Sequence, residues 1–220
     1  WNSAIGHAPY LQFAGDADRI WFMATDTHPD LAPTGPFKNS IRMGYFKDDD
    51  KVYDLANVDL GAFPVLPTAP TLVFDGTTDG SWCWDLKKHS ADLTGAFASF
   101  PTTSAHRYHR ARVVSGVPTT EIVVNDAGGP LYAGQPYYSG GICCHPTNPD
   151  IMYASFPVSG VHQIHQMDRV SAGVWTPTQL TFGLVPSFRP DTSTGVLTFV
   201  RGTYTDYGIF PECRIMGMTI

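Results

Sequence analysis

Three side chains that can transfer protons or hold an anion open the segments of an internal repeat. His7 and Tyr138 each precede a strongly apolar run by 13 residues, and Arg189 stands at a similar place in another segment. Histidine titrates near neutral pH, tyrosine can share a proton, and arginine grips carboxylates in a bidentate fork. The three residues therefore form a candidate catalytic or binding set. The alternative is that each one only hydrogen-bonds a neighbouring part of the fold.

A second candidate set lies on one predicted strand, residues 106–113 (HRYHRARV). Side chains alternate across a strand, so His106, Tyr108, Arg110 and Arg112 share one face. Such a face is poorly suited to an apolar core and well suited to an anionic ligand. The alternative is the solvated face of an edge strand, on which arginine discourages pairing with other chains.

His28 is a third candidate, because it follows an apolar strand directly. It lies in the sequence TDTHP at 25–29. The alternative is a turn histidine that is held by the preceding Asp26 and restricted by Pro29.

The elements that must position these side chains are short. Gly (21) and Pro (18) punctuate the chain, and the apolar runs between them are rich in β-branched and aromatic residues, which is typical of strands. The one helix candidate, with a weak period, is Lys87–Leu93. We predict strands at Arg19–Thr25, Ser40–Phe46, Thr71–Phe74, Trp82–Leu86, Arg107–Val114, Glu121–Val124, Ile151–Phe156, Val161–Met167 and Gly195–Arg201.

Four segments share one plan, a short strand, a polar turn and a strongly apolar strand, and they start near residues 7, 69, 138 and 189. Antiparallel four-stranded repeats at such a period are the blades of a β-propeller. We therefore predict an all-β fold, with residues 1–220 forming one propeller domain of about four blades. It is either a small closed ring or part of a larger, seven-bladed type of ring. The alternative is a β-sandwich whose hairpins are similar by chance.

Composition excludes some function classes. The formal net charge is −6 and there is no Lys/Arg run, so nucleic-acid binding is not expected. No stretch of about 20 apolar residues occurs, so no membrane span is expected. The four cysteines do not resemble a disulfide framework, because chains of that kind are short and rich in cysteine. Because the chain begins at Trp1 rather than Met, we expect a processed or excised piece.

Several pieces of the sequence resemble one known family. They are HAPY at 7–10, TDTHP at 25–29, YSGGI at 138–142 and FRP at 188–190. They resemble the BNR-repeat (sialidase-like) propeller family, which includes ulvan lyases and related polysaccharide lyases. The ordered match runs from about residue 5 to about residue 215 and is similar to the C-terminal half of such a propeller. The resemblance implies that further blades, or a larger assembly, complete the ring.

The resemblance also implies an activity, the cleavage of a uronate-containing acidic polysaccharide by β-elimination. Members of the family use two histidines about twenty positions apart, and His7 and His28 are 21 positions apart. The resemblance makes His7 the leading general base or acid and His28 a second histidine of the pocket. Tyr138 would protonate the leaving oxygen, or share acid and base duties with His7.

An arginine must neutralise the uronate carboxylate before the neighbouring proton can leave. In the family a strand comparable to residues 106–113 supplies it, and Arg112 fits that position best. The predicted catalytic residues are therefore His7, His28, Tyr138 and Arg112, and the predicted substrate-binding residues are Arg110, Tyr108 and Arg189. The resemblance further implies a secreted or extracellular protein, or one on a virion surface.

The elimination requires no cofactor. Cys143, Cys144, His145, His162 and His165 are zinc-type ligands, and some relatives in that family carry a structural zinc. However, His162 and His165 are three apart on a predicted strand and so face opposite sides, and there is no Cys-x-x-Cys pair. We predict no metal site, with a structural zinc as the alternative.

Two other function classes compete with the lyase. A non-catalytic glycan-binding propeller, for example the receptor-binding part of a surface or phage tail assembly, would use the same aromatic and arginine side chains. A hydrolytic sialidase-like enzyme would need a Tyr/Glu nucleophile pair and an acidic proton donor. Glu121 and Glu212 are the only glutamates and neither is well placed, so this class ranks last.

Overall fold

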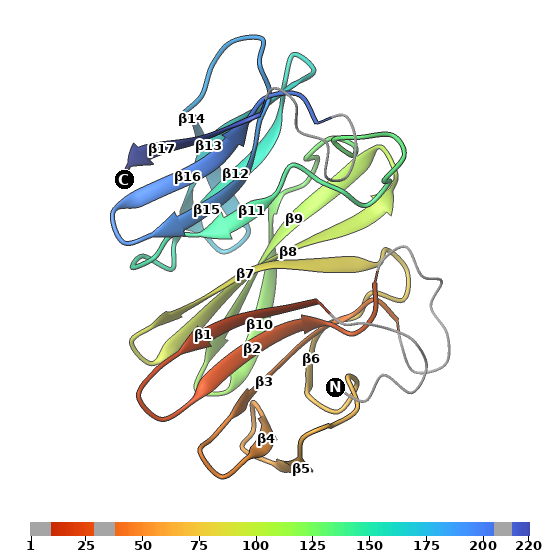
Figure 1. Ribbon diagram of the computed structural model, residues 1–220, viewed down its shortest axis with the longest axis vertical. Helices are drawn as coiled ribbons and strands as arrows, with labels where there is room; N and C mark the ends of the chain where they lie inside the picture. Colours follow the sequence, from red (N-terminus) through yellow and green to blue (C-terminus); the bar gives the residue numbers. More distant parts are fainter. Residues whose placement is uncertain (1–9, 29–37, 205–212) are drawn as a thin grey trace.

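The computed structural model describes residues 10–28, 38–204 and 213–220, and every regular element within them is a β-strand (Figure 1). The strands are β1 (Tyr10–Gly15), β2 (Ile20–Thr25), β3 (Ile41–Phe46), β4 (Lys51–Asp54), β5 (Asp59–Ala62), β6 (Thr71–Phe74), β7 (Ser81–His89), β8 (Asp92–Thr102), β9 (Ala105–Val114), β10 (Val117–Val124), β11 (Ile142–Cys144), β12 (Ile151–Val158), β13 (Val161–Ser171), β14 (Val174–Gln179), β15 (Ser187–Ser193), β16 (Val196–Arg201) and β17 (Arg214–Thr219).

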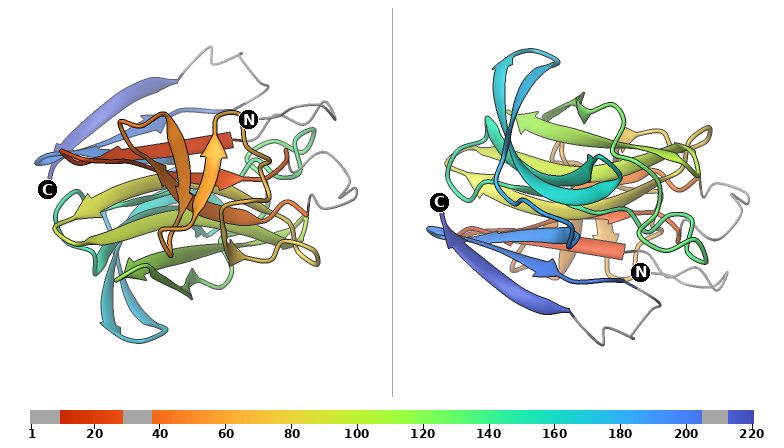
Figure 2. Two further views of the ribbon diagram at one scale, coloured as in Figure 1. Left: turned by 90° about the horizontal axis from the view of Figure 1, so that it is seen from below. Right: turned by 90° about the horizontal axis from the view of Figure 1, so that it is seen from above.

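The strands form four antiparallel sheets in chain order. The first joins β1 to β5, with β6 added on β3; the second and third are the four-stranded meanders β7–β10 and β11–β14; and the fourth is β15–β17. The first strands of the sheets pack in sequence, β1 on β7, β7 on β11 and β11 on β15 (Figures 1 and 2). This arrangement confirms the expected all-β propeller built from antiparallel blades.

Two details differ from the sequence-based prediction. The segment expected to form the second repeat, near residue 69, is divided, because β6 pairs with β3 while β7 opens the second sheet. Gly76 lies at this crossing, where a Cβ atom would stand 2.1 Å from the carbonyl oxygen of Asn39. The helix candidate Lys87–Leu93 is wrong: the segment is the β7–β8 hairpin turn, with Ser90 at a φ of 46°. The predicted strands are all present.

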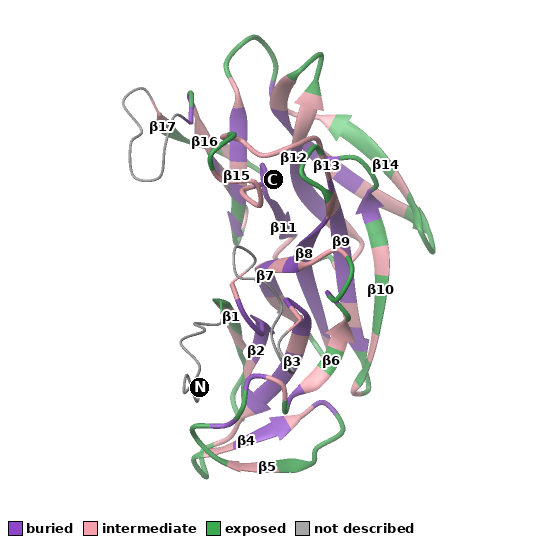
Figure 3. Ribbon diagram, turned by 90° about the vertical axis from the view of Figure 1, so that its right-hand side faces the viewer, coloured by how far each residue is buried: buried purple, intermediate pink, exposed green. Residues whose placement is uncertain are grey.

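The apolar core consists of layers between neighbouring sheets, and β8 is buried along most of its length (Figure 3). Met23 and Met43 pack against Leu93 and Phe97 between the first and second sheets. The adjacent cysteines face different layers, as alternation along a strand requires. Cys144 belongs to the layer between the second and third sheets, and Cys143 to the layer between the third and fourth.

Side-chain hydrogen bonds also join the inner strands to neighbouring sheets. The amide of Cys83 in β7 donates to Thr25 Oγ1 (2.9 Å), and the amide of Cys144 in β11 donates to Asp85 Oδ2 (2.9 Å). The hydroxyl of Thr192 in β15 donates to the carbonyl oxygen of Cys144 (2.6 Å). Backbone groups at the inner edge of one sheet are thus satisfied by side chains of a neighbouring sheet, as buried polar groups require.

In the part of the chain that the structure describes, we find no helix with the length and apolar character needed to span a bilayer.

A buried histidine makes acid stability testable. His109 in β9 stacks on Phe97 with ring centroids 4.6 Å apart, and its Nε2 lies 2.8 Å from Ser99 Oγ. Burial, with a smaller effect of the Arg107 charge, lowers the pKa of His109 to about 4. A histidine whose folded pKa lies below its unfolded value of about 6.5 stabilises the fold above that value, and this stability is lost as the pH falls.

We therefore expect the free energy of unfolding to fall by about 2 kcal/mol from this residue between about pH 7 and about pH 5. Urea unfolding at the two pH values measures the loss. The variant His109→Gln should show a flatter pH dependence than the wild type. An equal slope in both proteins would mean that other groups, such as His162, whose pKa burial also lowers to about 4, carry the effect.

Candidate functional site

Aromatic side chains from all four sheets meet where the inner strands begin. Tyr10 opens β1, Trp82 lies at the start of β7, and Tyr138 lies in the loop before β11. His28 follows β2, and Tyr204 follows β16. We call this group the aromatic mouth; it consists of Tyr10, His28, Trp82, Tyr138 and Tyr204, with Arg189 of β15 beside it.

The rings of the aromatic mouth form a continuous chain of contacts. The centroid of Tyr10 lies 5.2 Å from that of His28 and 4.8 Å from that of Trp82. Trp82 meets Tyr138 edge to face at 5.7 Å, and Tyr138 stacks on Tyr204 at 5.2 Å. Rings at these separations attract one another, and their flat faces suit a ring-shaped ligand. The group therefore forms a continuous aromatic layer at the end of the inner strands, in which Tyr10 is exposed and Tyr204 is buried.

Arg189 brings a positive charge to this surface. Its guanidinium carbon lies 4.6 Å from the centroid of Tyr138 and 5.9 Å from that of Tyr204. Both distances are within the range of cation–π attraction. The guanidinium is thus placed on the aromatic mouth, where it can meet an anionic group of a ligand.

The backbone explains how β15 delivers Arg189. Pairing of β15 with β16 shifts register between Phe188 and Asp191, which marks a bulge at Arg189. Arg189 has a φ of 53°, and its amide donates to the carbonyl oxygen of Gly140 (2.6 Å). A non-glycine residue in this region costs about 1 kcal/mol or more, and such residues concentrate at functional sites. The strained bulge therefore changes the direction of the Arg189 side chain from the one that regular alternation along β15 would give.

His28 is held by its neighbours in the loop. Asn39 Nδ2 donates to the carbonyl oxygen of His28 (2.9 Å) and to that of Thr27 (3.3 Å). The carboxylate of Asp26 does not serve as the expected support of the imidazole; it accepts the amide of Ser40 (3.1 Å). Burial raises the pKa of Asp26, while the hydrogen bond from the Ser40 amide opposes the shift. The backbone that carries His28 is therefore fixed through buried polar groups.

A cavity of about 320 Å³ lies along the four inner strands. Its lining includes Gln12 of β1, Trp84 and Asp85 of β7, Cys143 of β11 and Arg189 of β15. Burial raises the pKa of Asp85 and also raises that of the Cys143 thiol, well above its usual range. Cys143 is therefore not a thiolate nucleophile. The cavity shows that Arg189 contacts both the aromatic mouth and the space along the inner strands.

The structure brings together some of the predicted site residues. His28 and Tyr138 belong to the aromatic mouth and Arg189 lies beside it, as the shared register of the repeats predicts for Tyr138 and Arg189. His7 lies outside the described residues. Tyr10, Trp82 and Tyr204 were missed by sequence reasoning. The sequence did hold a signal for two of them. Trp82 stands at the start of an apolar strand, and Tyr10 lies three residues after His7.

The other predicted site residues have partners between the second and third sheets. Tyr108 is fully buried; its hydroxyl donates to the carbonyl oxygen of Ser155 (2.9 Å) and accepts the amide of Gly141 (2.8 Å). Arg110 forms ion pairs with Glu121 (2.7 Å) and Asp150 (2.8 Å).

Arg112 pairs with Asp92 at 2.8 Å. The predicted polar face of 106–113 is thus mostly buried against the third sheet, because each polar tip finds a partner there or beside it. Neither an open ligand face nor a solvated edge describes it, since β9 lies inside its sheet.

Zinc-type ligands do not converge in the described residues. Within 10–28, 38–204 and 213–220, no group of three or more His, Cys, Asp or Glu side chains could hold a metal ion. The four cysteines, all described, form no disulfide with one another.

Comparisons with known proteins give fold similarity at low identity. No family model matches the chain, and no curated protein matches its sequence. Among solved structures, one prolyl endopeptidase aligns over 88% of this chain and 24% of its own length, with 12% identity and a TM-score of 0.48. The polysaccharide lyase Uly1 aligns over 88% of this chain and 42% of its own length, with 10% identity and a TM-score of 0.47. The chain therefore spans less than half of either protein.

Proposed function

We propose that this chain contributes the binding and reaction surface of a lyase-like propeller that cleaves a uronate-containing acidic polysaccharide by β-elimination. The observation that supports the proposal is the position of Arg189, whose guanidinium lies over Tyr138 and beside Tyr204. A sugar stacked on the aromatic mouth would bring its carboxylate to this guanidinium. The acidic polysaccharide is the proposed partner, and an extracellular location follows from that substrate.

Arg189 has the role on which the chemistry depends. The proton at C5 of a uronate is weakly acidic, and its removal places negative charge on the adjacent carboxylate. A guanidinium bound in advance stabilises this developing charge, which is usually the largest contribution to such a rate enhancement.

The elimination step then needs one base and one acid. A histidine takes the C5 proton, the C5–H electron pair forms the C4–C5 double bond, and the C4–O bond breaks with its electrons on the leaving oxygen. His7 is the predicted base and His28 is the histidine of the aromatic mouth that lies near Tyr10 and Trp82. Tyr138 donates a proton to the leaving oxygen. Atoms and charge balance without a cofactor.

A panel of uronate polysaccharides, including ulvan, tests the proposal. Cleavage by elimination leaves a conjugated unsaturated uronate that absorbs in the ultraviolet, whereas hydrolysis leaves none. We expect absorbance to rise with at least one polymer and to depend on Tyr138. A protein that cleaves polymers without this absorbance would not be a lyase.

Non-catalytic glycan binding is the second candidate, and the aromatic character of the mouth favours it. Four aromatic rings and a histidine stand there beside a single arginine, which is a composition suited to holding a sugar without reacting. Binding without any absorbance change across the panel would select this function.

Both candidates predict a role for Trp82. Truncation in Trp82→Ala removes the ring that joins Tyr10 and His28 to Tyr138. We expect affinity for an acidic oligosaccharide, measured by calorimetry, to fall about tenfold. Trp21→Ala is the matched control, because Trp21 packs on Tyr45 and donates to Asp16 instead. Equal losses in both variants would assign the effect to folding.

A further inference from the structure

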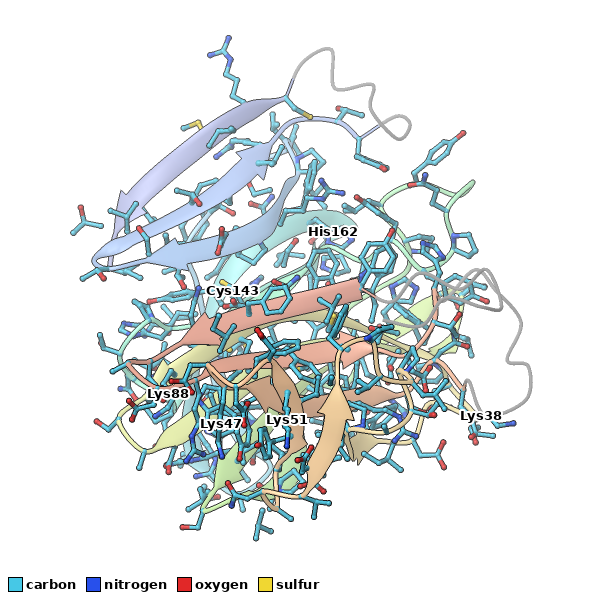
Figure 4. All side chains as sticks on the ribbon, turned by 60° about the horizontal axis from the view of Figure 1, so that its bottom comes forward. Lys38, Lys47, Lys51, Lys88, Cys143 and His162 are labelled. Atoms are coloured by element: carbon cyan, nitrogen blue, oxygen red, sulfur yellow. The ribbon has the colours of Figure 1, made fainter. Side chains whose placement is uncertain are left out.

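A second cavity, of about 370 Å³, lies between the third and fourth sheets and shares Tyr204 with the aromatic mouth. Three prolines (Pro130, Pro157 and Pro186) and the ring of Phe188 form much of its wall, and His162 is its one imidazole. His162 lies at the start of β13, between the two sheets (Figure 4). Its size, and a lining that combines apolar side chains with uncharged polar groups, are those of a small-molecule site.

The hydrogen bonds of Ser155 determine which nitrogen of His162 carries the proton. The Ser155 hydroxyl donates to the carbonyl oxygen of Ser187 (2.8 Å), and this uses its one hydrogen. His162 Nδ1 lies 3.2 Å from Ser155 Oγ and must therefore be the donor in that contact. The Nε2 atom of the neutral ring is then an acceptor.

Charge around His162 favours a neutral ring. None of the described residues that line the cavity carries a formal charge. Burial lowers the pKa of His162 to about 4, and the nearby His106 adds to the effect. Near neutral pH the cavity thus offers an uncharged acceptor and apolar walls, which match the hydroxyls and carbon face of an uncharged sugar and do not match a carboxylate.

The cavity is also joined to Arg189 through the backbone. Gly140 packs so closely on His162 that a Cβ atom there would lie 2.6 Å from Nδ1. The carbonyl oxygen of the same residue accepts the amide of Arg189 (2.6 Å). A ligand that occupies the aromatic mouth and one that occupies this cavity would therefore be close neighbours.

We propose that this cavity is a second subsite, which binds an uncharged sugar unit next to the uronate in the same polymer chain, with a sugar hydroxyl donating to His162 Nε2. The inference rests on the proposed function, because it takes the uronate to lie at Arg189. It assigns the aromatic mouth to the acidic unit and the His162 cavity to its uncharged neighbour. The described residues of the two sites differ in the same way: the aromatic mouth has the guanidinium of Arg189 beside it, and the lining of the His162 cavity carries no formal charge.

Calorimetry with two ligands tests the inference on the whole chain. The ligands are a methyl uronide and an oligosaccharide in which the same uronate is flanked by uncharged sugars. We expect the wild type to bind the oligosaccharide more tightly than the methyl uronide. In His162→Leu the affinity for the oligosaccharide should fall about tenfold, while the affinity for the methyl uronide is unchanged. His162→Gln, which keeps an acceptor, should retain part of the gain.

Leu131→Trp supplies a second variant that does not alter the imidazole. Leu131 lines the same cavity, so the larger ring should fill it and remove the gain in the same way. A gain that survives both His162→Leu and Leu131→Trp would overturn the inference and leave the proposed function standing. If the methyl uronide binds equally well to wild type and Arg189→Lys, the uronate does not lie at Arg189, and both ideas fail. Thermal unfolding of each variant checks that it is folded.

Discussion

Arg189→Ala is expected to lower kcat/KM for elimination by a factor of about 100 to 1000, the usual cost of removing one group that stabilises developing charge. The side chain is the only part that changes, because alanine and arginine meet a similar restriction at the φ of 53°. Arg189→Lys should remain well below the wild type, since lysine keeps the charge and loses the bidentate fork. Initial rates of ultraviolet absorbance measure the effect.

A carboxyl-reduced polymer separates the charge from the rest of the site. Its uronates have become uncharged alcohols, so wild type and Arg189→Ala should bind it with similar affinity. Arg201→Ala is the matched control, because Arg201 lies in the same sheet and donates to the carbonyl oxygen of Phe182. We expect the control to change kcat/KM by less than about twofold.

Arg112→Ala decides between two assignments of the neutralising arginine. The resemblance predicts Arg112 for this role, whereas the structure pairs Arg112 with Asp92 at 2.8 Å. We expect the variant to keep its activity. If Arg112→Ala abolished elimination and Arg189→Ala did not, the carboxylate would have to bind at β9, and the aromatic mouth would not be the reaction site.

Arg110→Met is expected to destabilise the protein by about 3 kcal/mol, because it breaks a buried ion pair from one side. The Arg110 side chain is 4% exposed and meets Glu121, Asp150 and the carbonyl oxygen of Pro149. Its guanidinium carbon also lies 5.3 Å from the ring centroid of Trp175. One side chain thus joins the second sheet to the third, and its loss leaves the largely buried carboxylate of Glu121 without one of its two arginine partners.

Chemical denaturation measures this loss, with Arg112→Met as the control. Arg112 is 27% exposed, so its ion pair is screened by solvent and should contribute about 1 kcal/mol or less. Arg110 also lowers the pKa of Asp150, and the Arg110→Met variant should raise that pKa towards its ordinary value. Equal stability of the two variants would show that Arg110 has no special place between the sheets.

The fold class could be predicted because it depends on local patterns. Short apolar runs between polar turns give strands, and the 13-residue spacing shared by His7 and Tyr138 gives the repeat of the blades. The division of the second repeat could not be predicted, since β6 and β7 have similar strand character and their separation accompanies a tertiary contact, the close approach of Gly76 to Asn39.

The site could be predicted in part. Tyr138 and Arg189 follow from the repeat register, because equivalent positions of different blades converge at one end. The polar face of 106–113 gave a wrong prediction for a physical reason. Arginine and tyrosine are rarely buried without partners, and the partners Asp150 and Ser155 lie 40 and 47 residues further along the chain. Sequence spacing alone carries no signal for such distant pairs. The same holds for the bulge that turns Arg189.

The side-chain hydrogen bonds along the inner strands bear on how the protein behaves with its neighbours. A strand at the edge of a sheet normally exposes amide and carbonyl groups that can recruit another chain and start aggregation. Here Thr25, Asp85 and Thr192 occupy such groups of β7 and β11 from the adjacent sheet. At Cys83 and Cys144 the backbone groups bonded in this way are therefore not available to a foreign strand while the sheets stay packed, and loosening of the sheets would free these groups before any strand is lost.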